Sequence, residues 1–509
     1  MASIKNKKYN AAYDLLSRNI IKNPDKIAFI DNNEEITYND LYLKVKAFSY
    51  SITNKNIHAN DRVIICMDDN ISYPIVFLGL IWTGIIPICI NTLLPSKDYK
   101  YMIEDSDAKA VIISEHLIDK FTPIIDKNDD ILIILNNNND LKSLINQTIE
   151  YKETPYNSYG DDIAFWLYSS GSTGSPKGTL HMHKSLIATS DNYAKTVLSI
   201  TENDICFSAA KLFFAYGLGN ALTFPMSVGA TSVLMADRPT PESVSNIINK
   251  QSVTLFFGVP TLYAALLNAQ INSDLFKSLR LSVSAGEALP ANLYEKWYNF
   301  LGVQVLDGIG STEMLHIFIS NTIENITPGA SGKPVQGYEA RLINDDGKVA
   351  NDNEIAELEI KGPSSASSYW NKPEKTSITF KGEWTKTGDK YIRDSNGVYT
   401  YCGRADDMMK VSGQYVSPFE VEAALQTHEE VLEAAVVANR DNNNLIKPKA
   451  YIILKTNSKK LENIKLDLTN HVKKQLTPFK YPRWYEFVDE LPKTATGKIQ
   501  RFKLRTNNE

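Results

Sequence analysis

Length and composition indicate a globular protein with more than one domain. The chain has 509 residues, of which 43% are hydrophobic and 22% charged, and one hydrophobic core rarely serves so long a chain. A formal net charge of −5 gives no electrostatic reason to bind nucleic acid or an anionic membrane, so we expect neither partner. The four cysteines are too widely spaced for a CxxC metal site, and Cys66 and Cys89 lie in apolar runs that favour buried free thiols.

The chain shows no targeting or membrane signal. Its first residues, MASIKNKK, are polar and lack the apolar core of a signal peptide. The most apolar stretch, 75–90, is interrupted by Gly79, Gly84 and Pro87 and falls short of the roughly 20 apolar residues of a membrane span. It predicts a buried helix that ends near Gly84 and is followed by a strand. We therefore expect a cytoplasmic protein.

Strand-like and helical patterns alternate along the first part of the chain. This alternation predicts an α/β fold whose sheets are covered by helices. The predicted strands are 62–66, 85–90, 110–114, 131–135, 252–257 and 281–285, and the predicted helices are 38–51, 96–105, 261–268 and 291–300.

The segment 168–178, YSSGSTGSPKG, follows an apolar run at 163–167 that predicts a strand. A glycine- and hydroxyl-rich loop after a strand can aim many donors at one anion, and Lys177 adds a positive charge. This pattern indicates a polyphosphate site. A Walker-type P-loop is excluded, because Pro176 disfavours a helix there and the order Lys-Gly-Thr is wrong. A Ser/Gly-rich surface linker is the alternative.

The pattern changes near residue 403. Residues 383–404 predict a β-hairpin with its turn at 394–397. The following 100 or so residues carry elements of their own and predict a smaller α+β domain attached at 403–407. Its elements are expected at 418–426, 431–438, 449–455, 465–476 and 484–488.

Seven further motifs accompany the 168–178 segment. In chain order they are 211–220 (KLFFAYGLGN), 258–263 (GVPTLY), 284–290 (SAGEALP), 307–313 (DGIGSTE), 384–389 (WTKTGD), 403–413 (GRADDMMKVSG) and 491–498 (LPKTATGK). Together the eight resemble the adenylate-forming superfamily of acyl-CoA synthetases, luciferases and carrier-protein adenylation domains. The resemblance covers essentially the whole chain.

The resemblance implies both a fold and a reaction. The expected fold is α/β: a large N-terminal domain (1–403) of covered sheets with a small β-barrel-like subdomain, a hinge (404–407), and a mobile α+β C-terminal domain (408–509). A carboxylate attacks the α-phosphate of ATP to give an acyl-adenylate and pyrophosphate, and a thiol, usually CoA, then displaces AMP. The implied cofactors and co-substrates are ATP, Mg²⁺ and CoA.

The resemblance also assigns residues to the reaction. Lys498 would bridge the carboxylate and the α-phosphate, Thr312 would contact that phosphate, and Glu313 would hold Mg²⁺, a cation that prefers oxygen ligands. Asp389 would accept the ribose hydroxyls, with Arg404 as a nearby donor. The phosphate loop comprises Ser169, Ser170, Gly171, Ser172, Thr173, Gly174 and Lys177. The wall of the adenine pocket comprises Gly286, Glu287, Ala288, Asp307, Gly308 and Ile309.

The resemblance assigns the second half-reaction to the C-terminal domain. Asp406 matches the hinge residue about which that domain would rotate. Its other face would then present Lys410, Ser412 and Gly413 to the pantetheine chain of CoA, and Gly413 would permit a close approach. Rotation answers a physical need, since one pocket must exclude water in the first step and admit a thiol in the second.

The motifs 211–220 and 307–318 resemble the benzoate–CoA ligase branch. By that resemblance Phe214 gates the pocket and its lining is Ala215, Tyr216, Gly310, His316 and Ile317. The lining holds no fixed charge, which favours a small aromatic acid over an amino acid or a long acyl chain. The role of His316 stays open: it can hydrogen-bond a ring substituent or pack as a neutral wall.

Three other functions remain open. The chain could load an aryl acid onto a carrier protein, or be a short-chain aliphatic acyl-CoA synthetase. It could also be a non-catalytic nucleotide-binding relative, although Lys498, Glu313 and Asp389 are all present. The leading prediction is an aryl–CoA ligase of aromatic acid degradation, expected as a homodimer.

Overall fold

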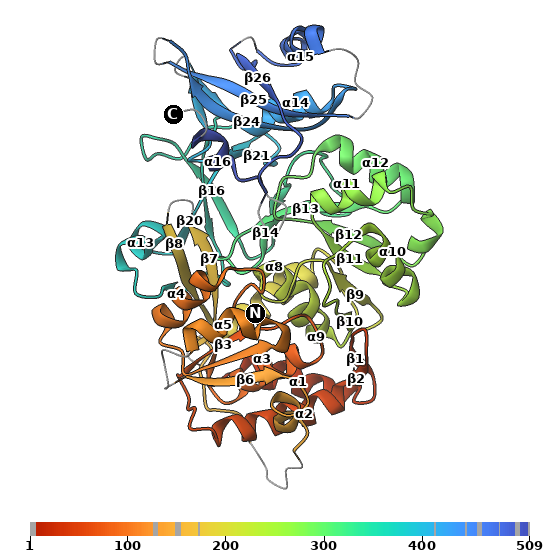
Figure 1. Cartoon of the computed structure of the whole chain (residues 1–509), viewed down its shortest axis with the longest axis vertical. Coiled ribbons are helices and arrows are strands. Elements are labelled where there is room, and N and C mark those ends of the chain that lie inside the picture. Colours follow the sequence, from red (N-terminus) through yellow and green to blue (C-terminus); the bar gives the residue numbers. More distant parts are fainter. Residues whose placement is uncertain are drawn as a thin grey trace.

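The computed structural model describes residues 7–125, 131–147, 154–171, 174–411, 414–442, 445–455, 461–477, 479–493 and 499–506. Figure 1 shows a large body built from the N-terminal four-fifths of the chain and a smaller body, coloured blue, at one end. This mixed α/β architecture confirms the predicted fold class. Within the described ranges, no helix is long and apolar enough to cross a membrane.

A seven-stranded sheet forms the first layer of the large body. Its strand order is β18-β8-β7-β4-β3-β5-β6, and the strands from β7 to β6 run parallel. The bounds are β3 (Arg62–Cys66), β4 (Ile86–Cys89), β5 (Ala110–Ser114), β6 (Leu132–Asn136), β7 (Ile163–Gly171), β8 (Gly174–Met182) and β18 (Ser368–Tyr369). The helices in this region are α2 (Tyr38–Thr53), α3 (Ser72–Trp82), α4 (Ser96–Ser106), α5 (Ile118–Ile125) and α6 (Leu141–Ile145). The predicted buried helix and following strand are therefore α3 and β4.

A nine-stranded sheet forms the second layer, in the order β15-β14-β13-β12-β11-β9-β10-β1-β2. The bounds are β1 (Ile27–Ile30), β2 (Glu35–Thr37), β9 (Ile205–Ser208), β10 (Thr231–Val233), β11 (Leu255–Gly258), β12 (Leu281–Ser284), β13 (Val305–Gly310), β14 (Ile317–Ser320) and β15 (Lys333–Pro334). The helices are α1 (Ala11–Lys22), α7 (His183–Thr189), α8 (Ala215–Leu218), α9 (Phe224–Val228), α10 (Pro241–Lys250), α11 (Pro260–Asn268) and α12 (Ala291–Leu301). Helices α11 and α12 meet through Tyr263 and the fully buried Trp297, whose rings lie edge to face at 4.8 Å.

A five-stranded antiparallel sheet corresponds to the small β subdomain expected from the sequence. It comprises β16 (Glu339–Ile343), β17 (Ala356–Lys361), β19 (Phe380–Lys381), β20 (Trp384–Arg393) and β21 (Tyr399–Arg404), beside α13 (Pro373–Thr379). The predicted hairpin is β20–β21. Its turn is closed by the Asp394 carboxylate, which accepts from the backbone N–H groups of Asn396 and Val398 at 2.9 and 2.8 Å.

The smaller body has its own hydrophobic core and a three-stranded sheet in the order β24-β25-β26. Its elements are β22 (Met409–Val411), β23 (Gln414–Val416), α14 (Pro418–Gln426), β24 (Val431–Arg440), β25 (Ile446–Leu454), α15 (Leu461–Gln475), β26 (Trp484–Phe487) and α16 (Arg501–Thr506). A buried ion pair between Glu422 and Arg501, at 2.8 Å, joins α14 to α16. The boundaries 1–403, 404–407 and 408–509 stay predictions.

Two local predictions were wrong. The segment after 167 is not a loop from its first residue, because β7 continues to Gly171 and the chain returns as β8 from Gly174, with Ser169 paired to Lys177. Strand β11 begins at Leu255 rather than at 252, since Ser252 has a left-handed φ of 50° and forms the turn that ends α10. All four cysteines are buried and free, which confirms the expectation for Cys66 and Cys89.

The two bodies touch where the β22–β23 hairpin meets the turn after β16. The Tyr415 hydroxyl donates to Asp345 Oδ2 at 2.7 Å. Lys390 lies 3.1 Å from Asp345 Oδ1, and Lys410 lies 4.0 Å from Oδ2. Asp345 therefore joins residues of both bodies, and the bonds from Tyr415 and Lys390 lower its pKa.

We predict that Asp345→Asn loosens this contact. The variant removes the charge that faces both lysines, and an exposed contact of this kind is worth up to about 1 kcal/mol, or roughly fivefold. Backbone hydrogen exchange in β23 should therefore be up to about fivefold faster. The control is Asp346→Asn in the same turn. Equal exchange rates for both variants would show that Asp345 does not hold the hairpin.

Candidate active site

Lys177 and Glu313 meet at the phosphate end of the candidate site. Tyr369 lies between them: its hydroxyl donates to Glu313 Oε1 at 2.7 Å, and Lys177 Nζ lies 4.2 Å from the centre of its ring. Burial lowers the pKa of Lys177, while the Glu313 carboxylate opposes that shift. The structure thus brings together the predicted phosphate lysine and the predicted metal carboxylate. Sequence reasoning missed Tyr369.

For several predicted phosphate-loop residues no side-chain contact is described. Ser172 and Thr173 lie outside the described residues, as do Lys498, Ser412 and Gly413. Ser170, Gly171 and Gly174 are placed only by their backbone, at the tip of the β7–β8 hairpin. The Ser169 hydroxyl is buried, and among the described residues it has no hydrogen-bond partner. A buried hydroxyl in that state is suited to a ligand oxygen.

Asp389 and Arg404 form the predicted ribose group on the β20–β21 hairpin. They are paired across the two strands, and Arg404 Nη1 lies 3.0 Å from Asp389 Oδ1. The charge of Asp389 raises the pKa of Arg404. Gly388 has a φ of 73°, and a Cβ there would lie 2.9 Å from Arg404 Nη2, so this position favours glycine.

The predicted adenine wall lies at the ends of β12 and β13. The segment 286–288 follows β12, and Gly286 has a φ of 92°. Asp307 and Gly308 lie in β13 with Ile309, and burial raises the pKa of Asp307 well above its usual range. Arg501 of the smaller body pairs with Glu422, and that charge raises its pKa, with a smaller contribution from Glu287.

His316 forms one wall of the predicted acid pocket. It is buried, its Nε2 lies 3.1 Å from Asn220 Oδ1, and burial lowers its pKa to about 3. The ring packs against Phe224, Tyr193 and Tyr216 at centroid distances of 4.5, 5.5 and 5.5 Å. His316 is therefore neutral at physiological pH, and its buried Nδ1 has no hydrogen-bond partner among the described residues, so both predicted roles stay open.

The remaining predicted pocket residues lie on α8 and where β13 pairs with β14. Phe214 precedes α8, Ala215 is its first residue, and the rings of Phe213 and Phe214 pack at 4.6 Å. Gly310 pairs with Ile317, and a Cβ at Gly310 would lie 2.7 Å from the His316 carbonyl group. The predicted lining thus consists of aromatic and aliphatic residues that carry no charge.

Asp69 anchors this pocket and was missed from the sequence. It follows β3, and its carboxylate accepts from the backbone N–H of Leu212 at 3.1 Å. Lys211 partly offsets its charge, yet burial raises the pKa of Asp69 to about 7. A single aspartate after a buried strand gives no local signal of this contact, because its partner is 143 residues away.

The described residues contain no group of three or more His, Cys, Asp and Glu side chains placed to hold a metal ion. A lone Glu313 beside a phosphate lysine suits Mg²⁺, which binds through one or two carboxylates together with substrate phosphates. Glu313 would hold that ion.

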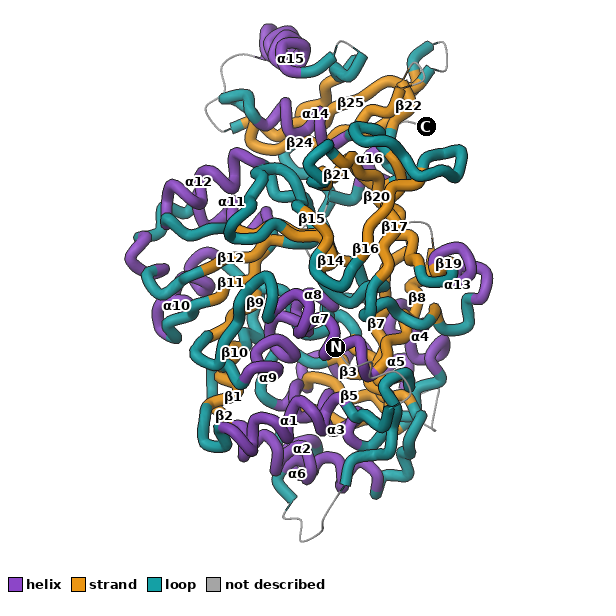
Figure 2. Tube along the Cα trace, turned by 180° about the vertical axis from the view of Figure 1, so that it is seen from behind, coloured by secondary structure: helices purple, strands orange, loops and turns teal. Residues whose placement is uncertain are grey.

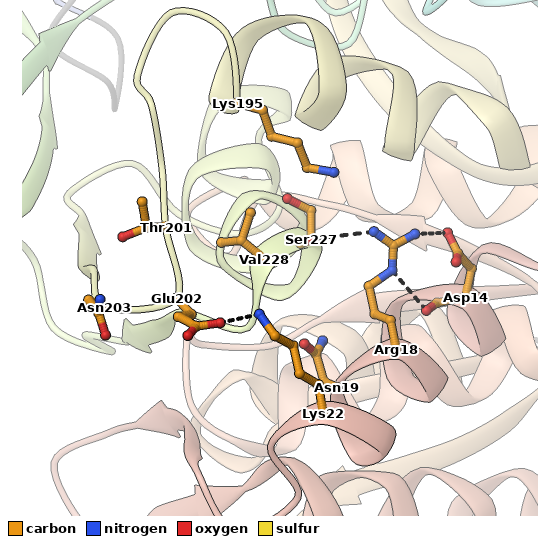
Figure 3. Close-up of a pocket in the computed structure, with 10 residues that line it drawn as sticks. All are labelled: Asp14, Arg18, Asn19, Lys22, Lys195, Thr201, Glu202, Asn203, Ser227 and Val228. Atoms are coloured by element: carbon orange, nitrogen blue, oxygen red, sulfur yellow. Dashed lines mark hydrogen bonds and ion pairs between the residues drawn. The ribbon is translucent and has the colours of Figure 1, made fainter.

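A cavity of about 680 Å³ lies between α1, α9 and the loop before β9, away from these residues (Figure 3). Its cations are already paired: Arg18 with Asp14, Lys22 with Glu202, and Lys195 with Asp191. None of the residues predicted to act in the reaction lines it.

Two family models match the chain. The AMP-binding enzyme model covers residues 16–370, and the AMP-binding enzyme C-terminal domain model covers residues 420–498. The chain therefore belongs to the AMP-binding enzyme family, whose members form adenylates, as the eight motifs predicted.

Individual relatives indicate which class of enzyme within the family the chain resembles. A benzoate–CoA ligase of Thauera aromatica is 51% identical over 507 residues, which cover 98% of this chain and 96% of that protein. A 4-hydroxybenzoate–CoA/benzoate–CoA ligase of Rhodopseudomonas palustris is 44% identical over 510 residues, or 98% and 94% of the two chains. These matches confirm the predicted enzyme class, an AMP-forming acid–thiol ligase that uses ATP, Mg²⁺ and CoA, and its resemblance to the benzoate–CoA ligase branch.

Solved structures of CoA ligases superpose closely on this chain. A benzoate CoA ligase from Burkholderia xenovorans LB400 superposes with a TM-score of 0.91 at 45% identity, covering 98% of this chain and 100% of that one. An anthranilate CoA ligase in complex with anthranoyl-AMP superposes with a TM-score of 0.93 at 39% identity, covering 99% and 98%.

We predict that Asp69→Asn alters the pH dependence of stability. In the folded protein burial raises the pKa of this group from 3.8 to about 7. Folding thus favours the protonated form. Its contribution to the free energy of unfolding is complete below about pH 4 and is lost as the pH rises to 7. An asparagine does not titrate, so the variant should gain melting temperature relative to the unmodified protein between pH 5 and pH 8.

Thermal unfolding at both pH values measures this difference. Asp68→Asn, at the more exposed neighbouring position, serves as the control. A difference for Asp69→Asn that stays constant with pH would contradict the prediction.

Proposed function

We propose that this chain is an aryl–CoA ligase that activates benzoate, or a hydroxy- or aminobenzoate, as an acyl-adenylate and transfers the acyl group to CoA. The supporting observation is that the predicted acid pocket has uncharged aromatic side chains packed around His316, which lies three residues after Glu313 in the chain. Such a pocket suits a planar ring and offers no acidic partner for an amino acid's ammonium group.

The first half-reaction joins two anions, so positive charge must be concentrated where they meet. Lys177 would bind the β- and γ-phosphates, Thr312 the α-phosphate, and Asp389 the ribose. Mg²⁺ held by Glu313 would supply further charge neutralisation. Lys498 would bring the carboxylate and the α-phosphate together from the smaller body, which allows its charge to be removed before the second step.

The second half-reaction requires a path for the thiol. Rotation about Asp406 would withdraw Lys498 and bring Lys410, Ser412 and Gly413 toward the site. In the present orientation Lys410 lies beside Asp345 on the outside of the small β subdomain. The CoA contacts, the cytoplasmic location and the homodimer all stay predictions.

The aryl specificity predicts the outcome of a substrate panel. With ATP, Mg²⁺ and CoA, AMP release should be at least tenfold faster, as kcat/KM, for benzoate than for hexanoate or acetate. A preference for an aliphatic acid would overturn the substrate but keep the mechanism. Adenylate formation without thioester formation would favour a carrier protein as acceptor.

Lys498 is proposed to act in the first half-reaction only, which predicts the effect of Lys498→Ala. The variant should lose at least 100-fold in adenylation, because the charge that joins the two anions is gone. Thioester formation from synthetic benzoyl-AMP and CoA should remain within about threefold, which single-turnover assays of each half-reaction can measure. Equal losses in both halves would refute this assignment.

A further inference from the structure

Tyr369 lies in β18, within the segment 366–370 that connects β17 to α13, and this segment pairs with the edge of β8 (Figure 2). Its backbone is fixed at both ends. The N–H of Ala366 donates to the Glu313 carbonyl at 2.8 Å, and the N–H of Trp370 donates to the Gly178 carbonyl at 2.8 Å. The segment therefore spans from the metal carboxylate's own backbone to the strand that carries Lys177.

The side chain of Tyr369 also connects Glu313 with Lys177, through its hydroxyl and its ring. Only 4% of the residue is exposed. Its hydroxyl donates to Glu313 Oε1 at 2.7 Å. The face of its ring meets Lys177 Nζ, an arrangement in which an aromatic ring attracts a cation.

The two contacts act on different partners. The hydroxyl fixes the carboxylate of Glu313, and the ring fixes the ammonium group of Lys177. Partners of this kind, which orient a metal ligand without touching the metal, typically change metal affinity or activity 10- to 100-fold when removed.

We propose that Tyr369 is a positioning residue that sets the separation of Glu313 and Lys177, and so pre-arranges the enzyme for ATP with its bound Mg²⁺. The proposal rests on the function proposed above. Tyr369 acts through Glu313 and Lys177 and takes no part in the chemical step.

Tyr369→Phe tests the hydroxyl alone, because the ring remains beside Lys177. ATP affinity is measured by calorimetry with Mg²⁺ and with EDTA, and adenylation by pyrophosphate exchange. The gain in ATP affinity that Mg²⁺ provides should shrink about 10-fold, and kcat/KM for ATP should fall 10- to 100-fold. The KM for benzoate and the ATP affinity in EDTA should change less than twofold.

Tyr369→Leu tests the ring. In addition to the effects of the phenylalanine variant, it should weaken ATP binding in EDTA two- to fivefold, since Lys177 is no longer held. A general loosening of the fold would instead raise the KM for benzoate as well.

Tyr338→Phe is the matched control. Its buried hydroxyl also makes a 2.7 Å hydrogen bond, but to Ser364 rather than to Glu313. This variant should keep the Mg²⁺-dependent gain within twofold. In a Glu313→Gln background, Tyr369→Phe should have little further effect, because the carboxylate it orients is already gone.

The outcomes separate this inference from the proposed function. An unmodified enzyme that fails to release pyrophosphate with any acid would refute the function. An active enzyme in which Tyr369→Phe keeps the full Mg²⁺-dependent gain, or matches Tyr338→Phe, would refute the positioning role alone.

Discussion

Tyr369 hydrogen-bonds Glu313 and its ring contacts Lys177, so three parts of the chain meet at one point. Glu313 follows β13 of the nine-stranded sheet, Lys177 lies on β8 of the seven-stranded sheet, and Tyr369 lies in β18, in the segment between β17 and β19 of the small β sheet. Opposite charges are held close together there without forming a direct ion pair. A polyphosphate with a bound cation needs both charges, one for each of its components. The relative placement of the two large sheets therefore decides whether the phosphate site exists.

The predicted acid pocket differs from the phosphate site in its charge. The phosphate site contains charged side chains, whereas the side chains around His316 are uncharged and burial keeps that imidazole neutral. A benzoate ring gains from apolar contact, while its carboxylate must reach the charged end of the same site. Gly310 and His316 lie a few residues from Thr312 and Glu313, so the single segment after β13 serves both environments. This short connection limits the acid to one whose carboxylate lies close to its ring.

Local features of the fold were predictable because their causes are local. The alternation of apolar runs located β3 and β5 with their observed bounds, and Asp394 with Gly397 located the β20–β21 turn. The end of the phosphate strand was mispredicted, since serine and glycine can extend a hairpin when a partner strand is available. The motifs selected Glu313, Lys177 and Asp389, and the structure places the first two against Tyr369 and the third beside Arg404, while their roles toward ATP stay predictions.

The missed residues share a different property. Tyr369 is 56 residues from Glu313, and Asp69 is 143 from Leu212. Each makes a contact that depends on how sheets and loops pack, so no pattern in its own neighbourhood marks it. These residues hold the site in place, whereas the motifs contain the groups that would touch the substrate.

An AMP-forming ligase activates the acid as an adenylate before CoA takes part. A rapid acid quench of a single turnover with carboxyl-labelled benzoate, ATP and Mg²⁺ in the absence of CoA tests this order of steps. Labelled benzoyl-AMP should accumulate to about one equivalent per active site, together with pyrophosphate, and adding CoA should convert it to benzoyl-CoA. Formation of ADP and an acyl phosphate, or of no labelled intermediate until CoA is added, would refute this order.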